Sequence, residues 1–369
     1  MILNTVEKIV EKHFFTREDL LYLLNTSDTE RLTLFGKARD TKAKVVGNKV
    51  YLRGLIEYSN YCKKNCYYCG IRSGNSRYAR YQMTDAEVLD AVGYAFMNDY
   101  ASIVIQSGER TNKTFVSKVE NLLKKINQQT EGKMHVTLSL GEQSEETYHR
   151  WFEAGAHRYL LRIEVSNQAL YNKLHPNNIT HDYQRRLNAL KTLRKVGYQV
   201  GTGVMIGLPF QTLSDLADDL HFFREFDIDM VGMGPYIEHA DTPLYQYRNE
   251  LLPLKERFEL SLKMVAILRI MMQNINIAAT TAMQAIDPQG REKALMAGAN
   301  VIMPNLTPVK YRQDYLLYEN KPCLDEDAEE CKNCLEVRIR MAGDTIGYGE
   351  WGDSKHFADR MSGQENMEL

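Results

Sequence analysis

The chain has 369 residues, of which 44% are hydrophobic and 25% are charged, and its formal net charge is −2. This balance is typical of a globular protein with a large core, and it argues against a broad nucleic-acid-binding surface. No apolar run reaches the roughly 18 residues that a membrane-spanning helix needs, and the N-terminus lacks the pattern of a secretory signal. We therefore expect a soluble, cytoplasmic protein without membrane or nucleic-acid partners.

Residues 1–45 read as helical, with Thr16 placed to cap a helix. Beyond them, eight β-rich apolar runs alternate with segments of helical period, two of which are capped by Thr84 and Thr212. The runs cover residues 49–59, 101–107, 133–140, 157–165, 198–207, 229–237, 275–283 and 300–305. This alternation predicts an α/β protein with a parallel sheet, which eight strands would close into a complete (β/α)₈ TIM barrel. The alternative is an open, doubly wound sheet.

The expected organisation is an N-terminal helical extension over 1–45, a barrel over 46–310 and a C-terminal segment over 311–369, where the alternation stops. All six cysteines fall in two triplets, one directly after the first strand and one in the C-terminal segment. Six cysteines in a long chain without a signal peptide favour metal ligation over disulfides.

The first triplet is Cys62, Cys66 and Cys69, with the spacing C-x₃-C-x₂-C. It lies on a polar loop at the C-terminal end of the first strand, the end at which barrel enzymes carry out chemistry. Three such thiolates can each bind one iron of a cubane cluster, which leaves the fourth iron open to a small ligand. A structural zinc site is one alternative, but it usually needs four closed ligands. A cluster of unligated cysteines is the other alternative.

Polar residues near the ends of neighbouring strands could serve a ligand bound at this loop. Gly108 and Glu109 follow the second strand and offer backbone groups close to the cysteines. Arg162 and Glu164 are alternate residues of the fourth strand, so they share one face and need either a ligand or each other. Arg186, in the next helical segment, could bind a carboxylate, although alone it would be read as a solvated surface arginine.

The cysteine spacing, with Tyr68 just before the last cysteine, resembles the signature of the radical S-adenosylmethionine (SAM) superfamily. The resemblance implies a [4Fe–4S] cluster on the first triplet, with SAM chelating its open iron. One electron from the cluster then cleaves SAM into methionine and a 5′-deoxyadenosyl radical. The residues that the resemblance places against SAM are Gly108, Glu109, Arg162, Glu164 and Arg186. Gly108 and Glu109 match the GGE segment of the family, although Ser107 replaces its first glycine.

Further segments resemble the HydE maturases of [FeFe]-hydrogenase, a biotin synthase-like group with a complete barrel. These segments are 137–142, 207–209, 229–232, 241–244, 279–283 and 299–305. The resemblance implies assembly of the dinuclear iron subcluster of the hydrogenase H-cluster, under anaerobic conditions. It also implies a small-molecule or organometallic substrate, other hydrogenase maturases as partners, and a one-electron reductant such as ferredoxin or flavodoxin.

The same resemblance suggests which residues line a substrate cavity. They are Thr137, Met230, Thr280, Thr281, Met303 and Tyr315. Threonine hydroxyls at strand ends suit small anions, whereas Met230 and Met303 could equally be core residues. Ile163 stands where the family often has histidine, so any role of that histidine is absent or moved.

The second triplet, Cys323, Cys331 and Cys334, has the spacing C-x₇-C-x₂-C in an acidic segment that we expect to be exposed. In the HydE group such a triplet can hold an auxiliary cluster near the barrel mouth, either [2Fe–2S] or [4Fe–4S]. Zinc or an adventitious metal is the alternative. We expect an iron–sulfur cluster here without assuming that it is catalytic.

Two other functions stay open at this point. One is a radical SAM enzyme that acts on a small amino-acid-like substrate, as methylornithine synthase does. The other is a non-enzymatic iron–sulfur carrier, although strand ends rich in glycine, threonine and charged residues argue against it. Sulfur insertion of the biotin synthase kind is disfavoured because no cysteine lies outside the two triplets.

Overall fold

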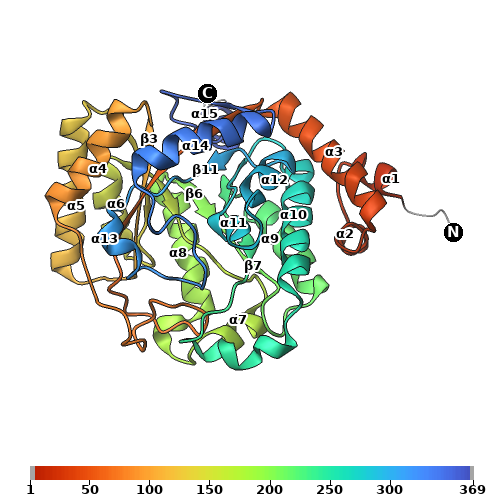
Figure 1. The fold of residues 1–369 in the computed structure, drawn as a ribbon, viewed down its shortest axis with the longest axis horizontal. Coiled ribbons are helices and arrows are strands. Elements are labelled where there is room, and N and C mark those ends of the chain that lie inside the picture. Colours follow the sequence, from red (N-terminus) through yellow and green to blue (C-terminus); the bar gives the residue numbers. More distant parts are fainter. Residues whose placement is uncertain (1–4, 366–369) are drawn as a thin grey trace.

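The computed structural model describes residues 5–365, without the side chains of Glu330, Cys331, Asn333, Gln364 and Glu365. A curled parallel sheet lies at its centre and is surrounded by helices, while α1, α2 and α3 extend to one side (Figure 1).

Seven parallel strands form one sheet in the order β10-β8-β6-β5-β4-β3-β2. Their bounds are β2 Gly54–Ser59, β3 Ser102–Ser107, β4 His135–Ser139, β5 Ala156–Leu160, β6 Gln199–Thr202, β8 Met230–Val231 and β10 Asn276–Ile277. An eighth segment that contains β11 (Val301–Ile302) bridges both edges of this sheet, pairing Ala278 with Val301 and Leu55 with Asn305. The predicted α/β fold is confirmed, and the two bridges are compatible with a full eight-stranded barrel.

Each predicted β-rich run contains a strand, but several strands are shorter than predicted. Within the run 157–165, strand β5 ends at Leu160, before Arg162 and Glu164. The prediction that both are strand residues is therefore wrong. The backbone of Glu164 has a φ of 68°, a left-handed conformation that interrupts an extended strand. The run 275–283 becomes helical at Thr281. Short apolar runs do not distinguish a buried strand from the start of a buried helix.

Four short strands complete the set: β1 Lys49–Leu52, β7 Met205–Ile206, β9 Gly234–Pro235 and β12 Thr345–Ile346. β1 continues directly into β2 and lies between β11 and β12. The sequence analysis did not predict β12, because two residues carry no periodic signal.

Helices follow the strands and cover the outside of the sheet (Figure 1). They are α4 Asp85–Met97, α5 Lys113–Gln129, α6 Glu145–Glu153, α7 Gln168–Leu174, α8 Tyr183–Val196, α9 Leu213–Glu225, α10 Leu254–Met271, α11 Thr281–Ile286, α12 Gly290–Met296, α13 Val309–Arg312, α14 Ala328–Met341 and α15 Lys355–Glu365. Two 3₁₀ helices, η1 Ile179–His181 and η2 Pro243–Glu250, interrupt the loops. Thr84 and Thr212 form capping boxes at α4 and α9, as predicted.

The described part of the N-terminal extension, residues 5–45, is mainly helical. Its helices are α1 Val6–Val10, α2 Arg17–Leu24 and α3 Asp28–Val45. The Thr16 side chain accepts a hydrogen bond from the Asp19 backbone, and the Asp19 side chain accepts one from the Thr16 backbone, which closes a capping box. α3 packs along α10 and α2 along α9, so the extension rests on the outer helices of the barrel.

The C-terminal residues seal the N-terminal end of the barrel. β12 pairs with the start of β1, and the Trp351 ring stacks 3.8 Å from the ring of His135 at the start of β4. Arg158 donates to the Trp351 carbonyl at 2.9 Å, and the Ser354 backbone donates to the Gln199 side chain at 3.0 Å. The opposite end, where the strands finish, carries the loops of the candidate site.

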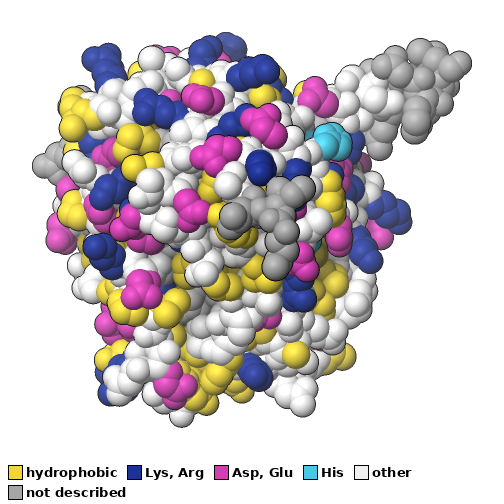
Figure 2. Space-filling model, turned by 90° about the vertical axis from the view of Figure 1, so that its right-hand side faces the viewer, with side chains coloured by type: hydrophobic (Ala, Val, Ile, Leu, Met, Phe, Trp, Pro, Cys, Tyr) yellow, Lys and Arg dark blue, Asp and Glu magenta, His cyan; other side chains and the backbone are white. Residues whose placement is uncertain are grey.

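Acidic and basic side chains are interspersed over the face of the molecule that Figure 2 displays. Among the described helices, none combines the length and the apolar character needed to cross a membrane.

Candidate active site

The loop between β2 and α4, residues 60–84, carries the first cysteine triplet, and we call it the cluster loop. Arg80 braces this loop, because its guanidinium donates to four of the loop's carbonyl oxygens at 2.6–2.7 Å. The four oxygens belong to Asn60, Ile71, Arg72 and Asn75. Backbone carbonyls away from water need such partners, so one side chain fixes the shape of the loop. The sequence carries no signal for this role.

The three cysteines of the cluster loop are free thiols; Cys66 is buried, and Cys62 and Cys69 are partly exposed. Burial raises the pKa of each thiol, that of Cys66 to about 12. Repulsion from neighbouring thiolates raises the pKa of Cys66 and Cys69 further. The thiols therefore lie close enough to sense one another's charge, and a bound cation would reverse these shifts.

This donor set fits the [4Fe–4S] cluster that the sequence implies. A cubane uses one thiolate for each of three irons, and the three thiols come from one braced loop. The backbone N–H of Glu109 donates to the Cys62 sulfur at 3.3 Å, a contact that favours the thiolate needed for ligation. Among the side chains that the structure describes, no three from histidine, cysteine, aspartate or glutamate are grouped around a position for a single metal ion.

The end of β3 approaches the cluster loop closely at Gly108. A Cβ atom on Gly108 would lie 2.5 Å from the Tyr61 carbonyl oxygen and 2.7 Å from the Cys62 Cβ. The Lys63 backbone donates to the Glu109 carbonyl at 2.9 Å and links the two segments. Only glycine permits this approach, so the residue type that the sequence singled out has a steric reason.

Glu109 and Arg186 belong to one buried network of charges that includes Lys64 of the cluster loop. Its centre is Glu142, which lies 2.8 Å from Arg186 and 3.1 Å from Lys64. Glu109 accepts from the Glu142 backbone at 2.9 Å, and its other oxygen lies 3.5 Å from Lys64. Burial alone would raise the pKa of Glu142, but the charges of Arg186 and Lys64 outweigh it and lower that pKa. The alternative interpretation of Arg186 as a solvated surface arginine does not hold, since its side chain is only 11% exposed.

Arg162 and Glu164 lie just beyond β5 and pair with each other at 3.0 Å. The Arg162 guanidinium also donates to the carbonyls of Gly232 and Val204, both at 2.8 Å. Arg186 donates to the Arg162 carbonyl at 3.4 Å, which connects this pair to the buried network. The ion pair thus ties together the loops that follow three strands, with the Glu164 carboxylate still partly exposed.

Two histidines that the sequence analysis did not single out, His175 and His181, hold the cluster loop from the side of α7. His175 Nδ1 donates to the Tyr171 carbonyl at 2.8 Å, so Nε2 accepts from the Tyr68 hydroxyl at 3.1 Å. His181 Nε2 accepts from the Asn65 backbone at 2.9 Å. Burial lowers the pKa of His175 to about 3 and that of His181 to about 4, so both are neutral acceptors.

The residues predicted to line the substrate cavity have different surroundings. The Thr137 hydroxyl is buried and makes no hydrogen bond to the described residues. The Thr280 hydroxyl donates to the Met233 carbonyl at 3.3 Å, and the Thr281 and Tyr318 hydroxyls lie 2.9 Å apart.

The remaining predicted cavity residues are two methionines and a tyrosine. Met230 receives a contact of 2.6 Å from buried Arg53, which also donates to the Gly352 carbonyl in the segment that seals the other end of the barrel. Met303 follows β11 and is partly exposed, whereas Tyr315 is buried.

The second triplet lies at the start of α14. Cys323 is partly exposed on the preceding loop, with a φ of 62°, and Arg291 lies 3.7 Å from its sulfur. Cys334 is exposed on α14, as the sequence predicts. The Cys331 side chain lies outside the described residues, so the geometry of a cluster at this triplet stays a prediction.

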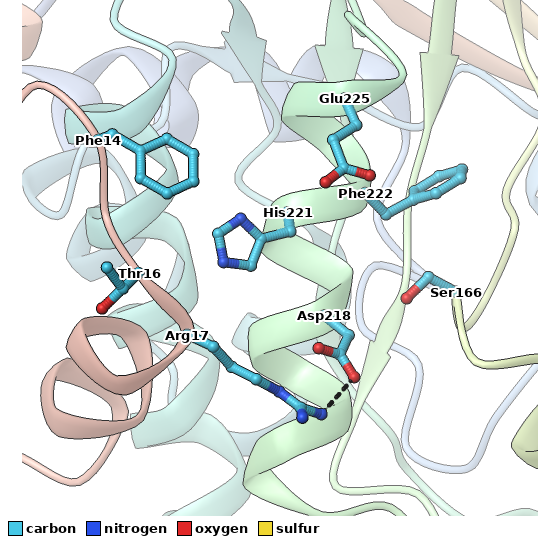
Figure 3. Close-up of a pocket in the computed structure, with 8 residues that line it drawn as sticks. All are labelled: Phe14, Thr16, Arg17, Ser166, Asp218, His221, Phe222 and Glu225. Atoms are coloured by element: carbon cyan, nitrogen blue, oxygen red, sulfur yellow. Dashed lines mark hydrogen bonds and ion pairs between the residues drawn. The ribbon is translucent and has the colours of Figure 1, made fainter.

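A separate groove of about 550 Å³ lies between the N-terminal extension and α9 (Figure 3). Arg17 pairs across it with Asp218 at 2.6 Å, and the rings of Phe14 and His221 stack 5.7 Å apart. None of the predicted site residues lines this groove.

Comparisons with known proteins agree with the chemistry of the cluster loop. Residues 56–223 match the model of the Radical SAM superfamily. The chain is 44% identical over 353 residues to the [FeFe] hydrogenase maturase subunit HydE of Thermotoga maritima, which covers 95% of this chain and 97% of that protein. It is 27% identical over 303 residues to the 3-methylornithine synthase of Methanosarcina acetivorans, which covers 80% of this chain and 81% of that protein.

Solved structures give the same fold. The crystal structure of methylornithine synthase (PylB) has a TM-score of 0.78 at 23% identity and covers 93% of this chain and 97% of that chain. The maturase HydG from Carboxydothermus hydrogenoformans has a TM-score of 0.76 at 19% identity and covers 93% of this chain and 79% of that chain. At these identities the likeness speaks for the fold alone. The match to HydE, which spans nearly the whole of both proteins, shows that this chain belongs to the HydE family of radical SAM enzymes.

Proposed function

We propose that this chain reductively cleaves SAM at a [4Fe–4S] cluster and uses the radical in the maturation of [FeFe]-hydrogenase, at the assembly of its dinuclear iron subcluster. The observation that carries the proposal is the braced cluster loop, which presents three thiols against the end of β3. The high identity to a HydE maturase supports the same role.

When bound, the cluster supplies the electron that breaks SAM into methionine and a 5′-deoxyadenosyl radical. The protein's own residues bind and orient SAM. One buried carboxylate oxygen of Glu109 makes no hydrogen bond to the described residues and lies 3.3 Å from Lys63 Nζ and 3.5 Å from Lys64 Nζ, so it could accept from the SAM amino group if it exchanged one of these ion pairs. Arg186 is held in place by Glu142 and could donate to the SAM carboxylate. The Arg162–Glu164 pair gives a partly exposed carboxylate for a further polar group of SAM.

The substrate side of the proposal rests on the barrel interior. The free hydroxyl of Thr137 and the Thr281–Tyr318 pair offer hydrogen bonds to a small-molecule or organometallic substrate. Tyr315 would add an apolar wall. Other hydrogenase maturases would deliver or receive the product, and ferredoxin or flavodoxin would supply the electron, all within the cytoplasm. An auxiliary [2Fe–2S] or [4Fe–4S] cluster at the second triplet completes the proposal.

The test is anaerobic. The protein is reconstituted with iron and sulfide, mixed with dithionite and SAM, and assayed for 5′-deoxyadenosine. We expect product from the wild-type chain and none from Cys66→Ala. A cluster-bearing protein with no affinity for SAM would favour the iron–sulfur carrier instead, and a lysine-derived product would favour the methylornithine synthase-like function.

A further inference from the structure

Residues 313–323 form no helix or strand and contact loops at the end of the barrel at which the cluster loop lies; they are the blue trace between α13 and α14 in Figure 1. We call this segment the mouth strap. Its two ends are tied together, because Arg312, which directly precedes it, donates to the carbonyl of Cys323, its last residue, at 2.7 Å. Compact surface loops whose ends lie close together are frequently functional.

One part of the mouth strap lies directly on the cluster loop. The Gly70 backbone donates to the Leu317 carbonyl at 3.0 Å, and Asn60 donates to the Asp314 carbonyl at 2.7 Å. A Cβ atom on Gly70 would lie only 2.0 Å from the Leu316 carbonyl oxygen. The strap therefore lies directly on Gly70, the residue that follows Cys69, and only glycine leaves room for this contact.

The other part of the strap reaches the opposite rim of the barrel. The Tyr318 hydroxyl lies 2.9 Å from the Thr281 hydroxyl, after β10. The Glu319 backbone donates to the Glu238 carbonyl at 3.2 Å, and the Ala240 backbone donates to the Glu319 carboxylate at 2.6 Å, both after β9. The strap thus spans the mouth from the loop after the first strand to the loops after later strands.

A single buried ion pair fastens the strap to the inside of the barrel. On β2, the Tyr58 ring packs 6.3 Å from the ring of Phe115 on α5, so Glu57, the residue before it, points to the opposite face of the strand, into the barrel. Lys321 Nζ lies 2.5 Å from the Glu57 carboxylate and 3.0 Å from the Tyr315 carbonyl. The two charged side chains are 6% and 2% exposed and lie 264 positions apart in the chain.

A buried ion pair contributes little net stability, but it specifies one arrangement, because breaking it leaves a charge without a partner. Here the arrangement that it specifies is the closed strap. We propose that Lys321 is a positioning residue: its pair with Glu57 latches the mouth strap over the barrel, and release of that latch admits SAM to the site. The inference rests on the proposed function only in naming SAM as the molecule admitted.

Hydrogen–deuterium exchange of the full chain tests the latch without any turnover. In Lys321→Met we expect the amides of 313–323 to exchange about tenfold faster or more, with those of β3 unchanged. Lys321→Arg keeps the charge and should exchange like the wild type. The matched control is Lys310→Met, which breaks the exposed Lys310–Glu87 pair and should leave the strap unchanged. Unchanged exchange of the strap in Lys321→Met would overturn the latch.

If Lys321→Met does not fold, the double variant Lys321→Met/Glu57→Gln removes both charges and serves the same test. Faster exchange confined to the strap supports the proposal, and wild-type exchange overturns it. Stopped-flow binding of SAM to the reconstituted protein tests the admission step. We expect Lys321→Met to speed association and dissociation alike, with Kd changed by no more than about threefold. A Kd that rises through dissociation alone would mean that Lys321 only shapes the bound site.

Discussion

The two cysteine triplets lie in contrasting surroundings. Cys66 of the first triplet is buried in a loop that Arg80 braces and that a network of buried charges supports. Cys334 of the second triplet is exposed on α14, and Cys323 is partly exposed on the loop before it. The comparison teaches that the first site is formed by the fold before metal binds, whereas a metal at the second site would have to be held mainly by its own ligands.

Among the substitutions that test this contrast, the largest loss of stability should come from replacing Lys64, which lies between the first two cysteines. Lys64→Met leaves the carboxylates of Glu109 and Glu142 with one cation fewer in a site where both are at most 4% exposed. We expect a loss of about 3–5 kcal/mol in unfolding free energy, measured by urea denaturation. Lys332→Met beside the second triplet loses one bond to Asn98 and should cost less than about 1 kcal/mol. Equal losses would contradict the contrast.

The second-largest loss of unfolding free energy should come from replacing Arg80. Arg80→Met leaves four carbonyl oxygens of the cluster loop without their donor, and we expect a loss of about 2–4 kcal/mol. The readouts are urea denaturation and the iron content after reconstitution, which should fall. In α14, Arg340→Met breaks only an exposed pair with Glu336 and should leave both quantities within error. Full iron loading of Arg80→Met would show that the loop does not need its brace.

The neutral histidine beside the cluster loop predicts a pH dependence. The pKa of His175 falls from 6.5 to about 3 on burial, so the folded chain binds fewer protons than the unfolded chain at pH values between these two. Stability that depends on the neutral ring is therefore present above pH 6.5 and is lost as the pH falls, by about 1.4 kcal/mol per pH unit. Urea denaturation at pH 7 and 5.5 checks this. In His175→Gln the slope should be smaller, and an unchanged slope would remove His175 as its source.

The smallest effect should come from the second triplet. Cys334 is exposed, so Cys334→Ser should change the unfolding free energy of the metal-free chain by less than about 0.5 kcal/mol. The same variant should lower the iron content without reducing 5′-deoxyadenosine formation. A large loss of stability would mean that this triplet is built into the fold as firmly as the first.

The sequence predicted the parts of the site that depend on short-range patterns. The spacing of Cys62, Cys66 and Cys69 lies within eight residues, and the alternation of strands and helices places their loop at the correct end of the sheet. The sequence did not show why position 108 must be glycine. The atoms that leave no room for a side chain there belong to the cluster loop, which packs against the end of β3 only in the folded chain.

The supporting contacts could not be predicted, because each joins segments far apart in the chain. Glu142 meets Lys64 across 78 positions (142 − 64), and Lys321 meets Glu57 across 264. No local periodicity signals such a contact. The prediction that Arg162 and Glu164 are strand residues was wrong for a local reason instead, since β5 ends at Leu160 and the backbone turns to a left-handed conformation at Glu164.

The central claim is that the first triplet alone carries the SAM chemistry. The most direct test is to compare two triple variants, Cys62→Ala/Cys66→Ala/Cys69→Ala and Cys323→Ala/Cys331→Ala/Cys334→Ala, after anaerobic reconstitution with dithionite and SAM. We predict no 5′-deoxyadenosine from the first variant and formation within about twofold of the wild-type rate from the second. Product from the first variant, or its loss from the second, would contradict the claim.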